Sequence, residues 1–183
     1  MERQASGSRV EAPAPELRRG RLKIFLGATP GAGKTFAMLR EAHQLREHGH
    51  DVVVGYVETY NRPRTVELIA GLEVIPRVRV TYRGTVLEEM DLDAVLRRRP
   101  EVALVDELAH SNVPGVRHEK RWQDVEDLRA AGIDVITTVN VQHVESVKDL
   151  VEKYVHGRIL WIFGEPYVNV LEVNLALDRG EAG

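Results

Sequence analysis

Short apolar runs and longer amphipathic segments alternate along most of the chain. Strands buried on both faces are expected where Val, Ile and Leu stand on consecutive positions, at residues 22–27, 51–57, 101–106 and 134–139. Helices are expected where apolar residues recur every three or four positions, at residues 34–48, 65–72, 92–96 and 122–131. A further strand is expected at residues 78–82. Because strands that alternate with helices pair in parallel through right-handed crossovers, the pattern predicts a three-layer α/β sandwich with a mainly parallel sheet.

The two ends of the chain are less regular. Residues 1–19 carry Ser, Gly, Pro and Ala without apolar periodicity, so we expect a flexible leader before a single domain at residues 20–183. A helix is expected at residues 141–153. Beyond residue 154 two strands are expected, at residues 158–163 and 167–177, but polar residues interrupt the second one and the topology there stays open.

Composition narrows the class of protein. A chain of 183 residues with 43% hydrophobic content can bury a substantial core. Its formal charge, 25 − 28 = −3, gives no electrostatic reason to expect nucleic acid as a partner. The absence of cysteine excludes disulfides and thiolate metal sites. No apolar run approaches the roughly 20 residues that cross a bilayer, so we expect a soluble chain without its own membrane span.

A glycine-rich loop stands between the first expected strand and the first expected helix. Residues 28–35 read ATPGAGKT, which is a P-loop with Ala28 in place of the first glycine. Such a loop turns its backbone N–H groups onto phosphate oxygens, and the following helix adds its positive end. The residues expected to contact the phosphates are Pro30, Gly31, Ala32, Gly33, Lys34 and Thr35. In this arrangement the Lys34 ammonium reaches the β- and γ-phosphates, and the Thr35 hydroxyl binds Mg²⁺.

An acidic pair closes another expected strand. Asp106 follows the apolar residues 102–105, at the strand end where ligands of open α/β sheets bind. We expect Asp106 to hold Mg²⁺ together with Thr35, and to complete a site for a nucleoside triphosphate and Mg²⁺ in a P-loop NTPase-like fold. Glu107 comes next and is a candidate general base for an attacking water. Glu58, which leaves the second strand, is an alternative candidate for that role.

Polar residues after other strands extend the candidate site. Asn140 leaves the last central strand and is suited to hydrogen-bonding a phosphate or its water. The polar segment at residues 110–121 follows Asp106 and Glu107 directly, and such a loop can sense the γ-phosphate through a cation. Arg117 is the expected nucleotide-binding residue there, with Arg121 as the alternative.

Several blocks of sequence resemble one known family. These are GRLKIF at residues 20–25 running into the Gly-Lys-Thr loop, DVVVG at 51–55, VET at 57–59, LVDELAH at 104–110, RWQDVE at 121–126, and TTVNVQHVES at 137–146. Together they resemble the cytoplasmic N-terminal domain of the KdpD sensor histidine kinases, over roughly residues 20–150. The resemblance implies an ATP-binding regulatory domain of a two-component system that controls potassium uptake.

The same resemblance implies partners and leaves the activity open. The partners would be nucleotide and the other domains or subunits of a potassium-responsive sensor kinase. The kinase core of that family has no counterpart in this sequence, so we do not expect histidine autophosphorylation here. The alternatives are an active ATPase or a phosphotransferase that acts on a protein or small-molecule hydroxyl, with Glu107 or Glu58 as base.

Overall fold

A seven-stranded sheet forms the centre of the molecule. The computed structural model describes residues 18–27, 30–140, 142–143, 160–164 and 168–173, the last two ranges by their backbone. Five strands pair in parallel, in the order β3 (Glu73–Val74), β2 (Val52–Tyr56), β6 (Val102–Val105), β7 (Asp134–Asn140) and β1 (Leu22–Gly27). The sheet continues beyond β1 with two antiparallel pairings, to β9 (Val168–Val173) and then to β8 (Leu160–Gly164).

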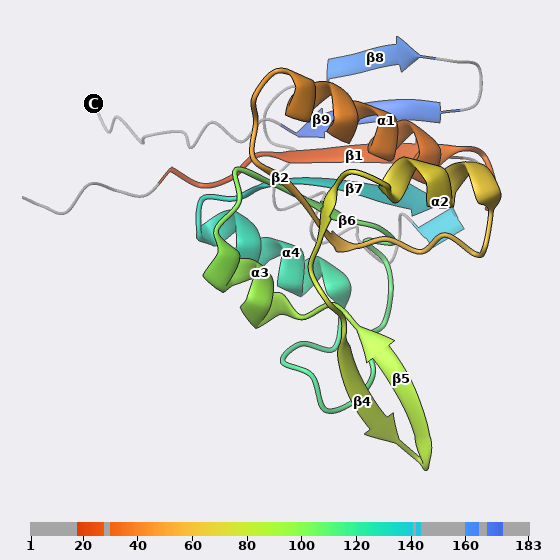
Figure 1. Ribbon diagram of the computed structural model, residues 1–183, viewed down its shortest axis with the longest axis vertical. Helices are drawn as coiled ribbons and strands as arrows, with labels where there is room; N and C mark the ends of the chain where they lie inside the picture. The colour runs from red at the N-terminus through yellow and green to blue at the C-terminus, as the bar shows by residue number, and fades with distance from the viewer. Residues whose placement is uncertain (1–17, 28–29, 141, 144–159, 165–167, 174–183) are drawn as a thin grey trace, which may run out of the picture.

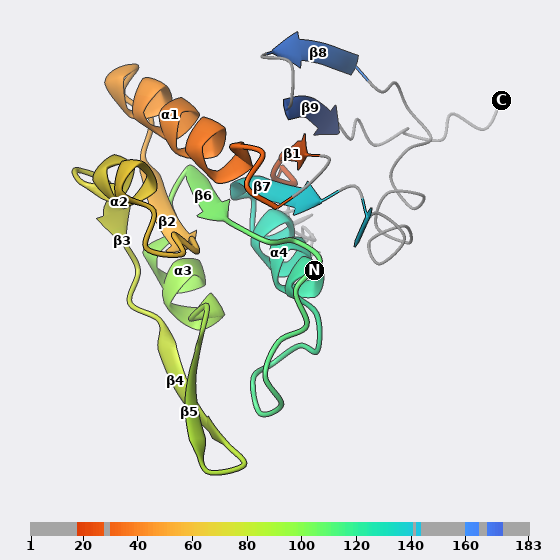
Figure 2. The same cartoon turned by 90° about the vertical axis from the view of Figure 1, so that its right-hand side faces the viewer.

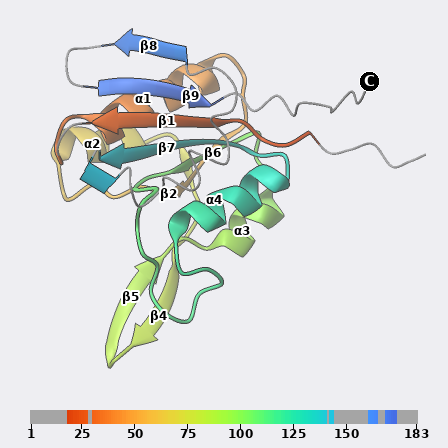
Figure 3. The same cartoon turned by 180° about the vertical axis from the view of Figure 1, so that it is seen from behind.

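Helices cover both faces of this sheet (Figure 1, Figure 2). Helices α1 (Lys34–Glu47) and α2 (Pro63–Ile69) lie on one face, and α3 (Leu92–Arg98) and α4 (Arg121–Ala130) lie on the other (Figure 3). The prediction of an α/β fold with a mainly parallel sheet is therefore confirmed. The α1 helix ends before Gly49, whose φ of 88° is left-handed, as expected for a glycine after a helix.

The core follows from the alternation of side chains along each strand. On the α1 and α2 face, Phe25, Leu104 and Ile136 pack against the buried Met38 and Leu39 of α1. The neighbouring strand positions, among them Ile24, Val53 and Val105, point the other way and pack with Val125 and Leu128 of α4. Because both faces are covered, the strands are apolar at consecutive positions, which is why they were visible in the sequence.

A β-hairpin projects from the body of the molecule (Figure 1). It consists of β4 (Val78–Tyr82) and β5 (Thr85–Glu89), which pair only with each other among the described strands. The turn residues Arg83 and Gly84 both have positive φ, 48° and 79°, as a two-residue hairpin turn of type I′ requires. The strand predicted at residues 78–82 is therefore present, but it does not join the central sheet. The prediction missed β5 and the two-residue β3.

The remaining predicted elements divide into observed and undescribed ones. The two strands expected near the C-terminus are present as β8 and β9. Most of the expected leader, residues 1–17, and most of the expected helix at 141–153 lie outside the described residues. Within the described part of the chain, no helix is both long and apolar enough to traverse a lipid bilayer.

Candidate functional site

The glycine-rich loop lies at the carboxyl edge of the sheet, between β1 and α1. Gly31 and Gly33 both have a φ of 88°, in the left-handed region that favours glycine. Gly33 precedes the first residue of α1, and no side chain caps the N–H groups at the start of that helix. Uncapped N–H groups and the positive end of a 14-residue helix favour the binding of an anion at this position. Ala32 lies half-buried between the two glycines, while Ala28 and Thr29 are outside the described residues.

Lys34 lies across the end of β1 and contacts β7. A Cβ on Gly27 would come within 2.8 Å of Lys34 Cγ and Cδ, so a larger residue there would displace the Lys34 side chain from this position. Gly27 is the register partner of Asn140, and the Lys34 ammonium donates a hydrogen bond of 2.5 Å to Asn140 Oδ1. Burial lowers the pKa of Lys34, and the charge of Arg62 lowers it further, whereas Asp106 opposes the shift. The sequence-predicted Lys34 and Asn140 are thus adjacent.

Asp106 is buried and accepts hydrogen bonds on both carboxylate oxygens. Its Oδ2 accepts from the Thr35 hydroxyl at 3.0 Å and from the Glu58 N–H at 3.3 Å. Its Oδ1 accepts from the Glu107 N–H at 3.1 Å and from the Thr138 hydroxyl. Burial raises the pKa of Asp106 and the charge of Glu107 raises it further, while the hydrogen bonds from Thr138, Thr35 and Glu58 oppose the shift only in part. A nearby cation would therefore stabilise the ionised carboxylate.

Thr35 and Asp106 have the geometry of a shared magnesium site. Their oxygens are 3.0 Å apart, and both are hard donors of the kind that Mg²⁺ prefers. The described residues contain no cluster of three or more His, Cys, Asp or Glu side chains that would hold a metal unaided. This pair fits Mg²⁺ nonetheless, because that ion usually takes one or two protein ligands and completes its shell with water and substrate phosphates.

Glu107 stands in a strained turn directly after Asp106. Its φ of 59° is left-handed, which is uncommon for a residue with a side chain. The turn aims its N–H at Asp106 Oδ1 and at Thr138 Oγ1, the latter at 3.1 Å. Its carboxylate accepts a hydrogen bond from the Tyr60 hydroxyl, and this bond is the main cause of a raised pKa for Tyr60. Glu107 thus borders the site with its carboxylate occupied by Tyr60.

The other candidate base, Glu58, is oriented differently. Its backbone N–H reaches Asp106, but its carboxylate accepts from Arg77 Nη1 at 3.5 Å and from the Tyr56 hydroxyl at 3.4 Å. Glu58 is not among the residues that line the cavity beside the loop. Of the two carboxylates, Glu107 is the one placed to meet a ligand there.

A cavity of about 560 Å³ brings most of the predicted residues together. The predicted residues that line it are Pro30, Gly31, Lys34, Thr35, Asp106, Glu107 and Asn140. They come from segments that are up to 110 positions apart, and they meet because β1, β6 and β7 end at the same edge of the sheet. Its volume is in the range of small-ligand sites.

The structure does not bring Arg117 to this cavity. Arg117 forms ion pairs with Asp93 of α3 and, at 3.4 Å, with Asp127 of α4, and it lines a separate cavity beside the hairpin. Those two carboxylates lie near the 110–120 segment and attract the guanidinium of Arg117. The alternative cation, Arg121, is fully buried; it donates to Glu89 at 2.7 Å and to the carbonyl oxygen of Asp106 at 3.3 Å. Arg121 therefore contacts the site through the carbonyl oxygen of Asp106.

Arg62 is a cation at this cavity that sequence reasoning missed. It lines the cavity, and a Cβ on Gly31 would lie 3.6 Å from Arg62 Nη2. The described part of the chain offers its guanidinium no hydrogen bond or ion pair; its recorded contact is with the ring of Tyr60, at 5.7 Å. The sequence signal that could have identified Arg62 is its position four residues after Glu58, past the end of β2. Segments that follow the carboxyl ends of parallel strands lie near the glycine-rich loop.

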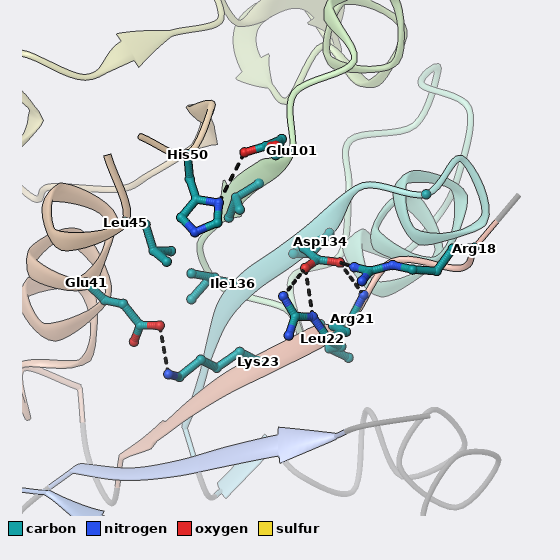
Figure 4. A pocket seen from close by; sticks show the side chains of 13 residues that line it. Arg18, Arg21, Leu22, Lys23, Glu41, Leu45, His50, Glu101, Asp134 and Ile136 are labelled. Carbon is teal, nitrogen blue, oxygen red and sulfur yellow. Dashed lines mark hydrogen bonds and ion pairs between the residues drawn. The ribbon is translucent and has the colours of Figure 1, made fainter. Parts of the chain in front are cut away.

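A second cavity, of about 500 Å³, lies at the opposite edge of the sheet (Figure 4). Its charged side chains pair with one another rather than facing the space. Lys23 contacts Glu41 at 2.7 Å, and Arg21 contacts Asp134 at 2.8 Å. His50 is 3.2 Å from Glu101. This internal pairing indicates a structural role, so the cavity at the carboxyl edge is the candidate site.

Comparison with known proteins points to one family. Residues 18–160 match the family described as KdpD, osmosensitive K⁺ channel His kinase sensor domain. The chain is 60% identical over 160 residues to the sensor protein KdpD of Escherichia coli (strain K12), covering 87% of this chain and 18% of that protein. It is 52% identical over 148 residues to a putative sensor protein KdpD of Synechocystis sp., covering 81% of this chain and 40% of that protein.

A shorter match concerns a different kind of protein. A segment of 39 residues is 62% identical to the potassium-transporting ATPase KdpC subunit of Anabaena sp. (strain L31), covering 21% of this chain and 19% of that subunit. The KdpD relatives extend well beyond the matched region, since the chain spans about a fifth of the first and two-fifths of the second. With the family match extending over residues 18–160, the chain belongs to the KdpD sensor family.

Proposed function

We propose that this chain is the nucleotide-binding regulatory domain of a KdpD-type potassium sensor and that its ligand is Mg-ATP. One observation carries the proposal: Lys34, Thr35, Asp106 and Asn140 converge on one cavity beside a loop with two left-handed glycines. Backbone N–H groups, an ammonium and a hydroxyl–carboxylate pair are the groups that a magnesium-bound polyphosphate requires. The strand order, with β7 between β1 and β6, supports a P-loop NTPase-like arrangement.

Each group has a distinct role in this proposal. The loop N–H groups and Lys34 bind the β- and γ-phosphates, and Arg62 adds a second positive charge above Gly31. Thr35 and Asp106 would hold Mg²⁺, which would neutralise negative charge on the phosphates. Lys34 exchanges its hydrogen bond to Asn140 for one to phosphate, and the Asn140 amide is then able to orient a water or a phosphate oxygen.

In this proposal, nucleotide binding is signalled through the hydrogen bonds that connect Asp106 to the hairpin. The Arg121 guanidinium joins the Asp106 carbonyl to Glu89, which ends the hairpin strand β5. Glu89 also accepts hydrogen bonds from the Val113 N–H and from His110, both at 2.9 Å. A shift of Asp106 on nucleotide binding would therefore reach both the hairpin and the 110–120 segment, which are the surfaces proposed to contact other parts of a sensor kinase. Such a domain would act in the cytoplasm.

The alternative is an ATPase or phosphotransferase, and Glu107 is the observation in its favour. A carboxylate next to the proposed magnesium ligand is positioned to orient an attacking water or hydroxyl. Here that carboxylate accepts a hydrogen bond from Tyr60, so catalysis would require Tyr60 to move away. Multiple-turnover phosphate release by the wild-type chain, abolished in Glu107→Gln, would favour the enzyme; saturable binding with slow or no turnover favours the sensor.

An equilibrium titration with labelled ATP tests the proposal. In the presence of Mg²⁺, Lys34→Ala is expected to lower ATP affinity by about 10-fold or more, since a charge-assisted hydrogen bond contributes roughly 1.5–3 kcal/mol. The matched control is Arg97→Ala, which removes an exposed cation from α3, on the other face of the sheet. Equal affinity in wild type and Lys34→Ala would refute the site assignment.

A further inference from the structure

Another cavity opens directly beside the proposed phosphate site. It has a volume of about 570 Å³ and shares Gly31, Lys34, Thr35 and Arg62 with the cavity that holds that site. The residues that belong to this cavity alone are Gly33, Phe36, Pro63, Arg64 and Thr65. A ligand whose phosphates lie on Lys34 can therefore extend into this space without leaving the surface of the protein. Neither the family match nor the names of the relatives assigns a role to it.

Phe36 is the feature that gives this cavity its chemistry. It directly follows Thr35 in α1 and is 36% exposed, whereas Met38, Leu39 and Ala42 of the same helix are fully buried. Packing against the sheet therefore does not account for an aromatic ring at this position. A large apolar side chain at the rim of a polar site is a common sign of a ligand contact.

Two guanidinium groups complete the lining. Arg62 and Arg64 flank Pro63 on the side of the cavity that α2 provides, opposite the start of α1. Guanidinium planes and aromatic rings both stack on heteroaromatic rings, and arginine also donates to ring nitrogens and carbonyl oxygens. No carboxylate is among the described residues that line this cavity. The cavity therefore has no negative acceptor for the N–H groups at the pairing edge of guanine, and it does not select guanine over adenine.

We propose that this cavity holds the purine base of the bound nucleotide, stacked on Phe36 and held at its edge by Arg64. This inference rests on the proposed function, because it requires the phosphates to lie on the glycine-rich loop. Stacking explains why an exposed ring is placed one residue after the magnesium-binding hydroxyl. It also predicts that adenine and guanine bind with similar affinity, and that both bind more tightly than the smaller pyrimidine rings.

The test separates the base from the phosphates. Calorimetric titrations of the whole chain with Mg-ATP and with magnesium tripolyphosphate, which lacks a nucleoside, are compared for wild type and Phe36→Ala. We expect Phe36→Ala to weaken ATP binding by roughly 5- to 150-fold, the range for loss of one stacked base, and to leave tripolyphosphate binding unchanged. Phe36→Trp should retain or improve ATP affinity. Because Phe36 is exposed, these variants are expected to fold, and circular dichroism checks this.

Controls distinguish failure of this inference from failure of the proposed function. Val86→Ala removes an exposed apolar side chain from the distant hairpin and should change neither affinity. Loss of both affinities in Lys34→Ala, with no selective loss of ATP in Phe36→Ala, would overturn the base site and leave the phosphate site standing. Unchanged affinities in Lys34→Ala would overturn both. A change of oligomeric state in Phe36→Ala with unchanged ATP affinity would instead identify the ring as a protein contact and overturn the inference.

Discussion

The buried ion pair beneath the site provides the sharpest test of how the site is supported. Arg121 and Glu89 have side chains that are 0% and 3% exposed, and their charged atoms are 2.7 Å apart. The Arg121 guanidinium also stacks on Tyr56, 3.8 Å from the ring centre. Arg121→Met keeps most of the apolar volume but removes the charge. The Glu89 carboxylate would then lack its buried counter-charge.

The expected loss follows from this burial. Breaking one side of a buried ion pair destabilises a protein by about 3–5 kcal/mol, because the remaining charge stays uncompensated. Glu89 retains hydrogen bonds from Val113 and His110, so we expect the lower end of that range, about 3 kcal/mol. Against a total stability of roughly 5–15 kcal/mol this is a large effect.

Urea unfolding followed by circular dichroism measures this loss. The matched control is Arg117→Met, because Arg117 is exposed and its ion pairs with Asp93 and Asp127 are expected to contribute less than about 1 kcal/mol. Glu89→Gln combined with Arg121→Met should recover part of the loss, since glutamine still accepts from Val113 while carrying no charge. Equal losses in Arg121→Met and Arg117→Met, or strict additivity in the double variant, would refute the reasoning.

Two further predictions concern carboxylates. Asp106→Asn should weaken ATP affinity more with Mg²⁺ than with EDTA, because the amide binds Mg²⁺ more weakly; equal losses in the two titrations would contradict the magnesium role. The pKa of Asp134 is lowered: burial would raise it, but hydrogen bonds from Arg21 and Arg18 outweigh that effect. Its contribution to stability is therefore complete above the ordinary aspartate pKa of about 3.9 and lost as the pH falls through the lowered folded value. Urea unfolding of wild type and Asp134→Asn should thus differ at pH 7 and converge near pH 2; a gap that persists in acid would contradict this assignment.

The central elements could be predicted because their physical causes are local. Strands covered on both faces must be apolar at consecutive positions, as β2 and β6 are, and such runs are visible without knowledge of the partners. The loop could be predicted for a similar reason, because Gly31 and Gly33 adopt a backbone conformation that favours glycine. The positions of Asp106 and Asn140 beside this loop could be predicted because polar residues at the ends of buried strands share one edge of a parallel sheet.

The hairpin could not be predicted in full. Strand β5 is exposed at four of its five positions. Without a buried face, its sequence cannot be distinguished from that of an exposed loop. Its partner β4 was visible because apolar and polar residues alternate along it. Which sheet a strand joins depends on contacts with distant residues, and the local pattern of β4 does not contain that information.

The sequence alone predicted that a glycine-rich turn, a lysine and two strand-end polar residues lie together, and they line one cavity. The tertiary structure alone decided which cations stand near it. Arg117 and Arg62 are both exposed arginines in loops, yet Arg117 pairs with Asp93 and Asp127 while Arg62 lies above Gly31. The position of a long cationic side chain depends on which carboxylates and open spaces the fold places within its reach. Those neighbours come from distant parts of the chain, so no local pattern records them.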